Sequence, residues 1–255
     1  MRVFFSPHIM YELLDASTLG DLATVRCLVE SGKVNVDLRD SDGWTALMCA
    51  CYYGHVKVVR YLVDSEKVNV DIQDNNGWTA LMHACCIPSD IERGVSIGDH
   101  IEIVRYLLES GNANANLQCN RGRPALMYAS LNSDIKVVHY IVKSGKVKVD
   151  FTDKHGQTSL MWASGYGKLK VVQYLVESGK ADVDLRDNKG QTALACALYT
   201  GFFDVVYYLR RFQIQAVCST KMLTAATRTA FLAYHYTPCN AGSRSAASHF
   251  ASLLE

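Results

Sequence analysis

The sequence predicts an all-α protein, an α-solenoid of stacked helix-turn-helix repeats with hairpin-like arms. The block Gly43–Met48, which reads Gly-Trp-Thr-Ala-Leu-Met, returns unchanged at Gly77–Met82. Looser copies begin at Gly122, Gly156 and Gly190, so that successive glycines are 34, 45, 34 and 34 residues apart. A period of this size is typical of an array in which each repeat buries its apolar faces only against its neighbours.

Each repeat is predicted to begin with a turn and a short helix. In the clearest copy, Gly43 ends a polar turn and Thr45 is a suitable N-cap for a helix over 46–51. That helix consists of small and apolar residues, which allows it to pack on two sides. Gly54 then ends the helix, because a residue without a Cβ tolerates the left-handed cap conformation.

A second helix and an arm complete the repeat. Valine and leucine recur at helical spacing over 56–63, which predicts a helix with one apolar stripe. Each second helix also carries a tyrosine, Tyr61 in this copy, which we interpret as a contact between repeats. The alternation Val-Asn-Val-Asp over 68–71 predicts an extended arm that leads to the next turn.

This unit resembles the ankyrin repeat, whose pattern has a turn glycine, Thr-Pro-Leu-His at the first helix and Gly-His before the second. The matching residues here are Gly43, Thr45, Leu47, Ala50, Gly54, His55, Val58, Val59, Leu62 and Val63. The resemblance covers residues 8–212 and implies a stack that binds a partner protein along the groove between its hairpin tips and first helices. Ala46 and Met48 replace the proline and histidine of the family pattern. We expect the stack to tolerate both changes.

Three regions follow from the repeat pattern. Residues 1–40 hold most of one unit but lack its Gly-x-Thr-Ala-Leu start, so we expect an N-terminal capping repeat. Residues 41–212 hold five repeats, with an insertion near 88–98 that is either neutral or functional. Residues 213–255 lack the pattern, and we expect a tail that is partly a cap on the last repeat and partly disordered.

The composition excludes several classes of function. The chain has 255 residues, of which 49% are apolar, and its net charge is +1. This charge provides no global field for nucleic acid or for a membrane surface. No apolar run approaches the roughly 20 residues that would span a bilayer. We therefore expect a monomer that neither binds nucleic acid nor inserts into a membrane.

The cysteines and histidines show no pattern of a chemical site. The nine cysteines are an odd number without framework spacing, which predicts reduced thiols in a cytoplasmic or nuclear protein. Cys49 and Cys51 would point to different sides of one helix, so we expect no metal site. No histidine has a recognisable nucleophile and carboxylate nearby, and no phosphate-binding glycine loop occurs. We expect no catalytic residues, no cofactor and no enzyme activity.

The candidate partner-binding residues occupy the positions that the resemblance places on the groove, at the hairpin tips and at the ends of the first helices. They are Trp44, Tyr52, Tyr53, Trp78, Ile87, Arg121, Arg123, Asn132, Tyr166 and Tyr199. Tryptophan and tyrosine are frequent anchors in protein interfaces. The alternative is that the two tryptophans fold onto the neighbouring hairpin and merely complete the stack.

The hairpin tips also change in charge along the chain. The first two tips contain Asp40, Asp42 and Asp74, whereas the third contains Arg121 and Arg123. Such a gradient would orient a partner segment with charges of opposite sign. The alternative is ordinary variation among polar turns.

Recognition is the function that these observations favour. We expect a non-catalytic protein–protein interaction module, or scaffold, that binds its partner along the groove. The alternative is a targeting or regulatory subunit that attaches an enzyme or a membrane complex through its C-terminal tail.

Overall fold

A computed structural model of the chain describes residues 7–86, 97–132, 135–178 and 181–219. Twelve helices and no strand occur in these described ranges. The chain divides into two compact units, residues 1–205 and residues 206–255. The predicted all-α fold class is confirmed.

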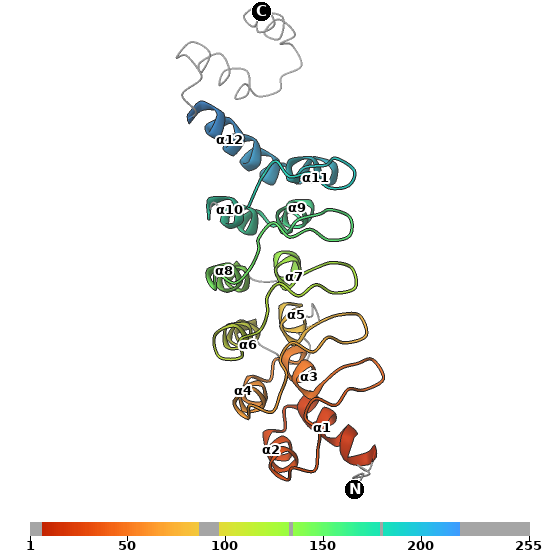
Figure 1. Cartoon of the computed structure of the whole chain (residues 1–255). Helices are drawn as coiled ribbons and strands as arrows, with labels where there is room; N and C mark the ends of the chain where they lie inside the picture. Colours follow the sequence, from red (N-terminus) through yellow and green to blue (C-terminus); the bar gives the residue numbers. More distant parts are fainter. Residues whose placement is uncertain (1–6, 87–96, 133–134, 179–180, 220–255) are drawn as a thin grey trace, which may run out of the picture. The chain divides into compact units, whose positions relative to one another are not determined.

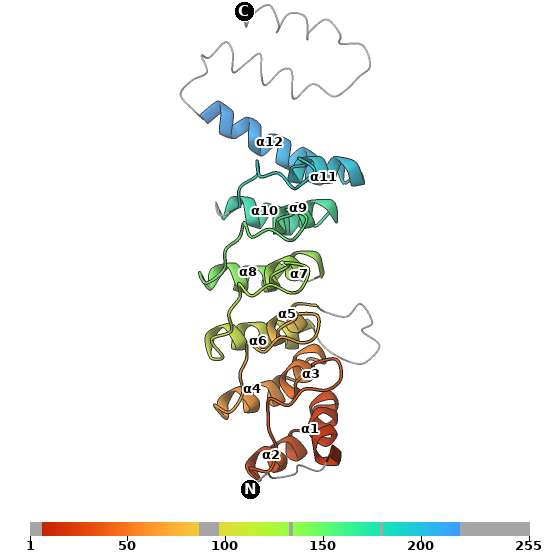
Figure 2. The same ribbon diagram turned by 45° about the vertical axis from the view of Figure 1, so that its right-hand side comes forward.

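The helices form pairs that repeat along the chain. The first helices of the pairs are α1 (Pro7–Leu19), α3 (Ala46–Tyr52), α5 (Ala80–Cys85), α7 (Ala125–Asn132), α9 (Ser159–Gly165) and α11 (Ala193–Thr200). The second helices are α2 (Leu22–Glu30), α4 (Val56–Asp64), α6 (Ile97–Glu109), α8 (Ile135–Lys143), α10 (Leu169–Glu177) and α12 (Phe203–Ser219). In the first unit, the odd-numbered helices α1 to α11 stack in one column, and the even-numbered helices α2 to α10 stack in a second (Figures 1 and 2).

The first helices begin and end where the sequence predicts. The side-chain oxygen of Thr45 accepts a hydrogen bond from the backbone N–H of Met48 at 3.3 Å and thereby caps α3. Equivalent threonines cap three later first helices, namely α5, α9 and α11. Gly54 follows α3 with a φ of +74°. That left-handed conformation strongly disfavours a residue with a branched side chain.

The core runs continuously through both columns. Leu47 and Met48 of α3 are at most 2% exposed, and the equivalent pairs in α5, α7 and α9 are buried to the same degree. Val58 and Val59 of α4 have no exposed surface. Because the first helices consist of small and apolar residues, each can be buried against its own second helix and against the first helices before and after it.

The arms differ from the prediction of an extended segment. The Asn69 side-chain oxygen accepts the N–H of Asp71 at 3.1 Å, and the Asn69 carbonyl accepts the N–H of Ile72 at 3.5 Å. Asparagine side chains often stabilise turns in this way. The alternation of valine with polar residues over 68–71 therefore accompanies a turn, and the prediction of an extended arm was wrong at this segment.

An aspartate at the base of the turn holds four of the hairpin tips, whereas in the third tip the Sγ of Cys119 takes this place and accepts the N–H of Arg121 at 3.3 Å. The carboxylate of Asp74 accepts the backbone N–H groups of Asn76 and Trp78, both at 2.8 Å. Asp40, Asp153 and Asp187 do the same in their own tips, with the residues two and four positions later. These bonds fix the direction in which the residue after each turn glycine leaves the tip.

Neighbouring tips are also bonded to one another. The N–H of Asn120 donates to the carbonyl of Asn76 at 2.9 Å, and an equivalent bond joins each adjacent pair of tips from Asp42 to Asn188. Gly77 has a φ of +78°, and a Cβ there would lie 2.7 Å from the backbone nitrogen of Asn120. The tips can approach this closely only because the turn residue is glycine.

Some predictions fall wholly or partly outside the described residues. Most of the insertion near 88–98 does so, although α6 begins at Ile97, so that the last two residues of the predicted insertion are helical. Helix α12 continues to Ser219, while the predicted cap and disordered tail beyond that residue lie outside the description.

Candidate partner-binding surface

One contact rule links the hairpin tips to the first helices. In the first three hairpin tips, the residue after the turn glycine meets the fourth residue of the first helix in the next repeat. The ring of Trp44 thus lies 4.2 Å, between centroids, from the ring of His83. The ring of Trp78 lies at the same distance, 4.2 Å, from the ring of Tyr128. We call this series of contacts between successive repeats the tip–helix ladder.

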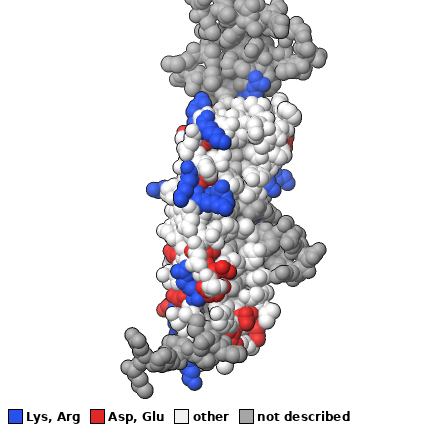
Figure 3. Space-filling model, turned by 90° about the vertical axis from the view of Figure 1, so that its right-hand side faces the viewer, with Lys and Arg blue, Asp and Glu red and all other residues white. Residues whose placement is uncertain are grey.

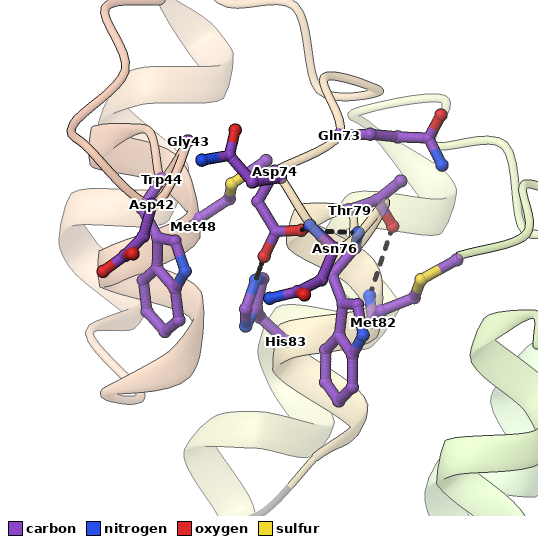
Figure 4. Close-up of polar contacts among 12 residues, drawn as sticks. Asp42, Gly43, Trp44, Met48, Gln73, Asp74, Asn76, Thr79, Met82 and His83 are labelled. Atoms are coloured by element: carbon purple, nitrogen blue, oxygen red, sulfur yellow. Dashed lines mark hydrogen bonds and ion pairs between the residues drawn. The ribbon is translucent and has the colours of Figure 1, made fainter. Parts of the chain in front are cut away.

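The first step of the ladder contains a buried polar pair. His83 is 4% exposed, and its Nε2 lies 3.1 Å from a carboxylate oxygen of Asp74. Figure 4 shows the imidazole directed at this carboxylate, with the Trp44 ring of the preceding repeat beside it. Burial opposes ionisation of Asp74, but hydrogen bonds from His83 and from the backbone of its tip outweigh it and hold the pKa of Asp74 below its usual value. The pair thus fixes the imidazole on which Trp44 rests.

Two tyrosines extend the N-terminal part of the ladder. Tyr52 meets Trp44 edge to face at 5.4 Å, and Tyr53 meets Tyr52 in the same manner at 5.1 Å. Both tyrosines and both tryptophans, Trp44 and Trp78, are half-buried. The tryptophans do pack onto the next repeat, yet each retains exposed surface, so packing and binding are compatible roles for these rings.

The third step of the ladder joins a cation to an aromatic ring. The guanidinium carbon of Arg123 lies 4.0 Å from the ring centroid of Trp162. Its Nε also lies 3.4 Å from the carboxylate of Asp153, a side chain with no exposed surface. The ring of Tyr166 stacks on the ring of Trp162, with 5.8 Å between the two centroids and an angle of 17° between the ring planes.

A hollow of about 510 Å³ opens beyond the third step. Its walls include Trp162, Tyr166 and Tyr199, and the latter two are 54% and 87% exposed. Gln157 and Gln191, which follow the turn glycines of the last two tips, also line it. The hollow lies within the first unit, between the third and fifth hairpin tips.

The tips around the ladder differ in exposed charge. Asp42 is exposed at the first tip, whereas Arg121, Lys154 and Lys189 are exposed at the last three. Figure 3 shows this face, with lysine and arginine gathered over its C-terminal part and most acidic residues over its N-terminal part. The aspartates of the later tips, Asp153 and Asp187, are buried and bonded to backbone N–H groups, so they do not offset these cations at the surface.

The structure brings the predicted residues together in two groups. Trp44, Tyr52, Tyr53 and Trp78 form the N-terminal group, while Arg121, Arg123, Tyr166 and Tyr199 lie in the C-terminal half. Ile87 lies outside the described residues, and Asn132 ends α7 with a side chain that the structure does not describe.

Sequence reasoning missed one half of the ladder, namely His83, Tyr128 and Trp162. All three occupy the fourth position of a first helix, where α3 and α11 have Cys49 and Cys196. Large polar or aromatic residues at a single register of otherwise small helices were the available signal.

Two histidines at the starts of second helices serve the stack. Nε2 of His55 lies 2.8 Å from the carbonyl of Thr18, and Nε2 of His100 lies 3.2 Å from the carbonyl of Tyr52. Each imidazole therefore contacts the end of the preceding repeat's first helix. Over the described ranges, no group of three or more potential ligands could hold a metal ion, and no helix is long and apolar enough to cross a bilayer.

Comparison with known proteins agrees with the repeat pattern. A family model for ankyrin repeats matches three times, at residues 13–91, 95–153 and 145–218. A human protein, ankyrin repeat domain-containing protein 29, is 52% identical over 40 residues, which are 16% of this chain and 13% of that protein. The aligned segment thus spans only a small part of that relative.

Solved structures share the fold over most of the chain. One is the complex of a predatory endopeptidase from Bdellovibrio bacteriovorus with an immunity protein. The match has a TM-score of 0.66 and 30% identity, and covers 78% of this chain and 97% of that one. An ankyrin repeat domain from Acinetobacter baumannii has a TM-score of 0.65 at 24% identity, covering 80% and 98% of the two chains.

Proposed function

The chain belongs to the ankyrin repeat family, and on this premise we propose that it is a non-catalytic module that binds a partner protein along its tip–helix ladder. Repeats of this family generally act in protein interaction. The binding surface would run over the hairpin tips and the exposed sides of the first helices, within residues 41–205.

The observation that carries this proposal is the exposure of aromatic side chains around the hollow. Tyr166 is 54% exposed and Tyr199 is 87% exposed, although both lie beside apolar walls. Tyrosine and tryptophan dominate the energetics of many interfaces, because they offer a large contact area and have few torsions to fix. An exposed aromatic rim around a concave site is therefore an arrangement suited to a protein partner.

The remaining candidates extend the proposed surface towards the N-terminus. Trp44, Tyr52, Tyr53 and Trp78 would contribute their exposed edges, already held in place by ring contacts within the ladder. Preorganised side chains lose little freedom on binding. Arg121 and Arg123 would supply charge from the third tip. We retain two further candidates, namely Ile87, which lies outside the described residues, and Asn132, the last residue of α7.

One of the similar solved structures supports a protein as the class of partner. That structure is a complex between two proteins, an endopeptidase and an immunity protein. At 30% identity the likeness bears on the kind of ligand and not on its identity.

The buried thiols support a reducing compartment, and we propose the cytoplasm or the nucleus as the location of a monomeric protein. Burial raises the pKa of Cys49 to about 11 and raises the pKa of Cys51 and Cys85 well above the usual value. None of these three forms a disulfide. Thiols of this kind are chemically inert and serve packing.

Site-specific photo-crosslinking in cells would test the proposed function. A benzoylphenylalanine at position 199 replaces a side chain that is 87% exposed, so the fold should be unchanged. The matched control carries the same group at Lys57, an exposed position on α4 in the other column. We expect a discrete protein adduct from position 199 that position 57 does not give. The same adducts from both positions, or no adduct from 199, would contradict binding along the ladder.

A further inference from the structure

The hollow lies where the tip–helix ladder loses its large side chains. The first three steps pair Trp44 with His83, Trp78 with Tyr128, and Arg123 with Trp162. By the same register, the fourth step pairs Gln157 with Cys196, and both of these residues line the hollow. Two rings, or a ring and a guanidinium, fill each earlier step, whereas an amide and a thiol leave the fourth step open.

A second small residue deepens the hollow. Gly165, at the end of α9, occupies the position that Tyr52 occupies in α3. A Cβ built on Gly165 would first meet the Cβ of Cys196, at 3.8 Å, which is an ordinary van der Waals distance. Small residues at two registers therefore create the space of about 510 Å³, which rings of Trp162, Tyr166 and Tyr199 surround.

The exposed charged side chains at the three hairpin tips on this side are positive. Arg121, Lys154 and Lys189 are exposed at the three tips on this side, while the tip carboxylates of Asp153 and Asp187 are buried. Arg121 and Lys154 belong to adjacent tips that a backbone hydrogen bond of 3.1 Å joins. Neighbouring cations of this kind favour an acidic ligand and increase its rate of association.

We propose that this hollow receives a large aromatic side chain from an acidic, extended segment of a partner protein. The incoming ring would occupy the fourth step of the ladder, between Trp162 and Tyr199, and acidic residues flanking it would lie against the cations of the tips. Side-chain amides of Gln157 and Gln191 line the same space and can hydrogen-bond to the main chain of the segment. This inference rests on the proposed function and specifies its partner.

A random peptide library displayed on phage, selected against the full chain, would test the proposal without knowledge of the natural partner. The selected peptides should converge on one tryptophan, tyrosine or phenylalanine flanked by aspartate or glutamate. A fluorescein-labelled synthetic peptide of the consensus sequence then serves as the probe in fluorescence anisotropy. Replacing its aromatic residue with alanine, or its acidic residues with lysine, should weaken binding at least about tenfold.

Three variants of the protein locate the binding of this probe. Gly165→Leu fills the hollow, and Tyr199→Ala removes an exposed wall without loss of buried contacts. Each should weaken binding about tenfold or more. Lys154→Glu should weaken binding and reduce its dependence on salt, whereas Lys57→Glu on α4, which makes the same charge change elsewhere, should leave both unchanged.

The outcomes separate this inference from the proposed function. A consensus without an aromatic residue or without acidic residues would overturn the inference, as would a probe whose affinity Gly165→Leu and Tyr199→Ala both leave unchanged. If Tyr53→Ala then weakened binding of the probe, the ladder would still bind peptides, and only the assignment of the site to the hollow would be wrong. A probe insensitive to every variant on the ladder would count against both proposals.

Discussion

In the tip–helix ladder, equivalent positions are packed in the N-terminal half but open to solvent in the C-terminal half. In the N-terminal half, Trp44 and Trp78 pack on His83 and Tyr128 of the following repeats, and all the rings are at least half-buried. In the C-terminal half, the last pair of large side chains is Arg123 with Trp162. Beyond it, Tyr166 and Tyr199 are exposed around a hollow.

The difference shows that the size of two side chains decides the role of each step. Where both members are large, the contact is satisfied within the chain and stabilises the junction between repeats. Where an amide and a thiol replace them, the backbone continues unchanged, because the hydrogen bonds of Asp153 to the N–H groups of His155 and Gln157 repeat those of the earlier tips. A stack can therefore open a hollow on its surface by changing side chains alone.

The largest expected effect is on the free energy of unfolding, for substitutions in a filled step and in the open step of the ladder. Trp78→Ala removes a ring that contacts both His83 and Tyr128, and we expect a loss of about 3 kcal/mol in the free energy of unfolding. Gln157→Ala removes a side chain at the edge of the hollow and should change this free energy by less than about 0.5 kcal/mol. Urea denaturation followed by circular dichroism would measure both. Equal losses would mean that the two halves do not differ in packing.

A smaller effect concerns the buried pair of the first step. Asp74→Asn removes the negative charge that His83 and two backbone N–H groups contact, and should cost roughly 2 kcal/mol at neutral pH. Because the pKa of Asp74 is held below its ordinary value of 3.8, its contribution is complete above that pH and is lost as the pH falls through the lower folded value. The variant should therefore lose less stability in acid than the wild type does.

The matched control for this pH dependence is Asp42→Asn, since Asp42 is exposed at the tip of the preceding repeat. It should leave stability nearly unchanged at neutral pH and should retain the acid dependence of the wild type. Urea midpoints measured at neutral pH and below pH 3.8 would distinguish the two substitutions. Identical urea midpoints of the two variants would show that the pair of Asp74 and His83 does not contribute to the pH dependence of stability.

Two glycines near the hollow should respond in opposite directions. Gly165→Ala adds a Cβ that meets only Cys196, at 3.8 Å, and should stabilise the chain by about 1 kcal/mol because alanine favours a helix. Gly167→Ala should destabilise it, because this residue has a φ of +67° and its Cβ would lie 2.4 Å from the ring of Phe202. Thermal melting of the two variants would test the assignment, and shifts of the same sign would contradict it.

The smallest effect is chemical and leaves stability unchanged. Cys85 has no exposed surface, whereas Cys196 is 9% exposed and lines the hollow. Burial raises the pKa of both thiols, so both should react slowly with a maleimide, but Cys196 should be modified before Cys85. Mass spectrometry of peptides from timed samples would give the order, and modification of Cys85 first would place the more open site in the N-terminal half.

The sequence predicted the parts of this architecture that one repeat encodes by itself. Thr45 and Gly54 mark the ends of α3 in any copy of the unit, and the structure confirms both. The contact of Trp44 with His83 could not be predicted in this way, because it joins different registers of two successive repeats. The turn at Asn69 was missed for another reason, since alternating valines resemble a strand unless the competing side-chain hydrogen bond is considered.

The register of the ladder also determines how such a chain could lengthen by duplication. A second copy of the unit that begins at Gly77 would place its tryptophan on another histidine, the same combination as Trp44 and His83, and the steps of the N-terminal half would remain filled. A second copy of the unit that begins at Gly156 would leave the contact of Arg123 with Trp162 in place, but the added step would put a glutamine, and not a guanidinium, on a tryptophan. Duplication in the N-terminal half would thus repeat a ring pair that the ladder already contains, whereas duplication in the C-terminal half would create a new combination of side chains.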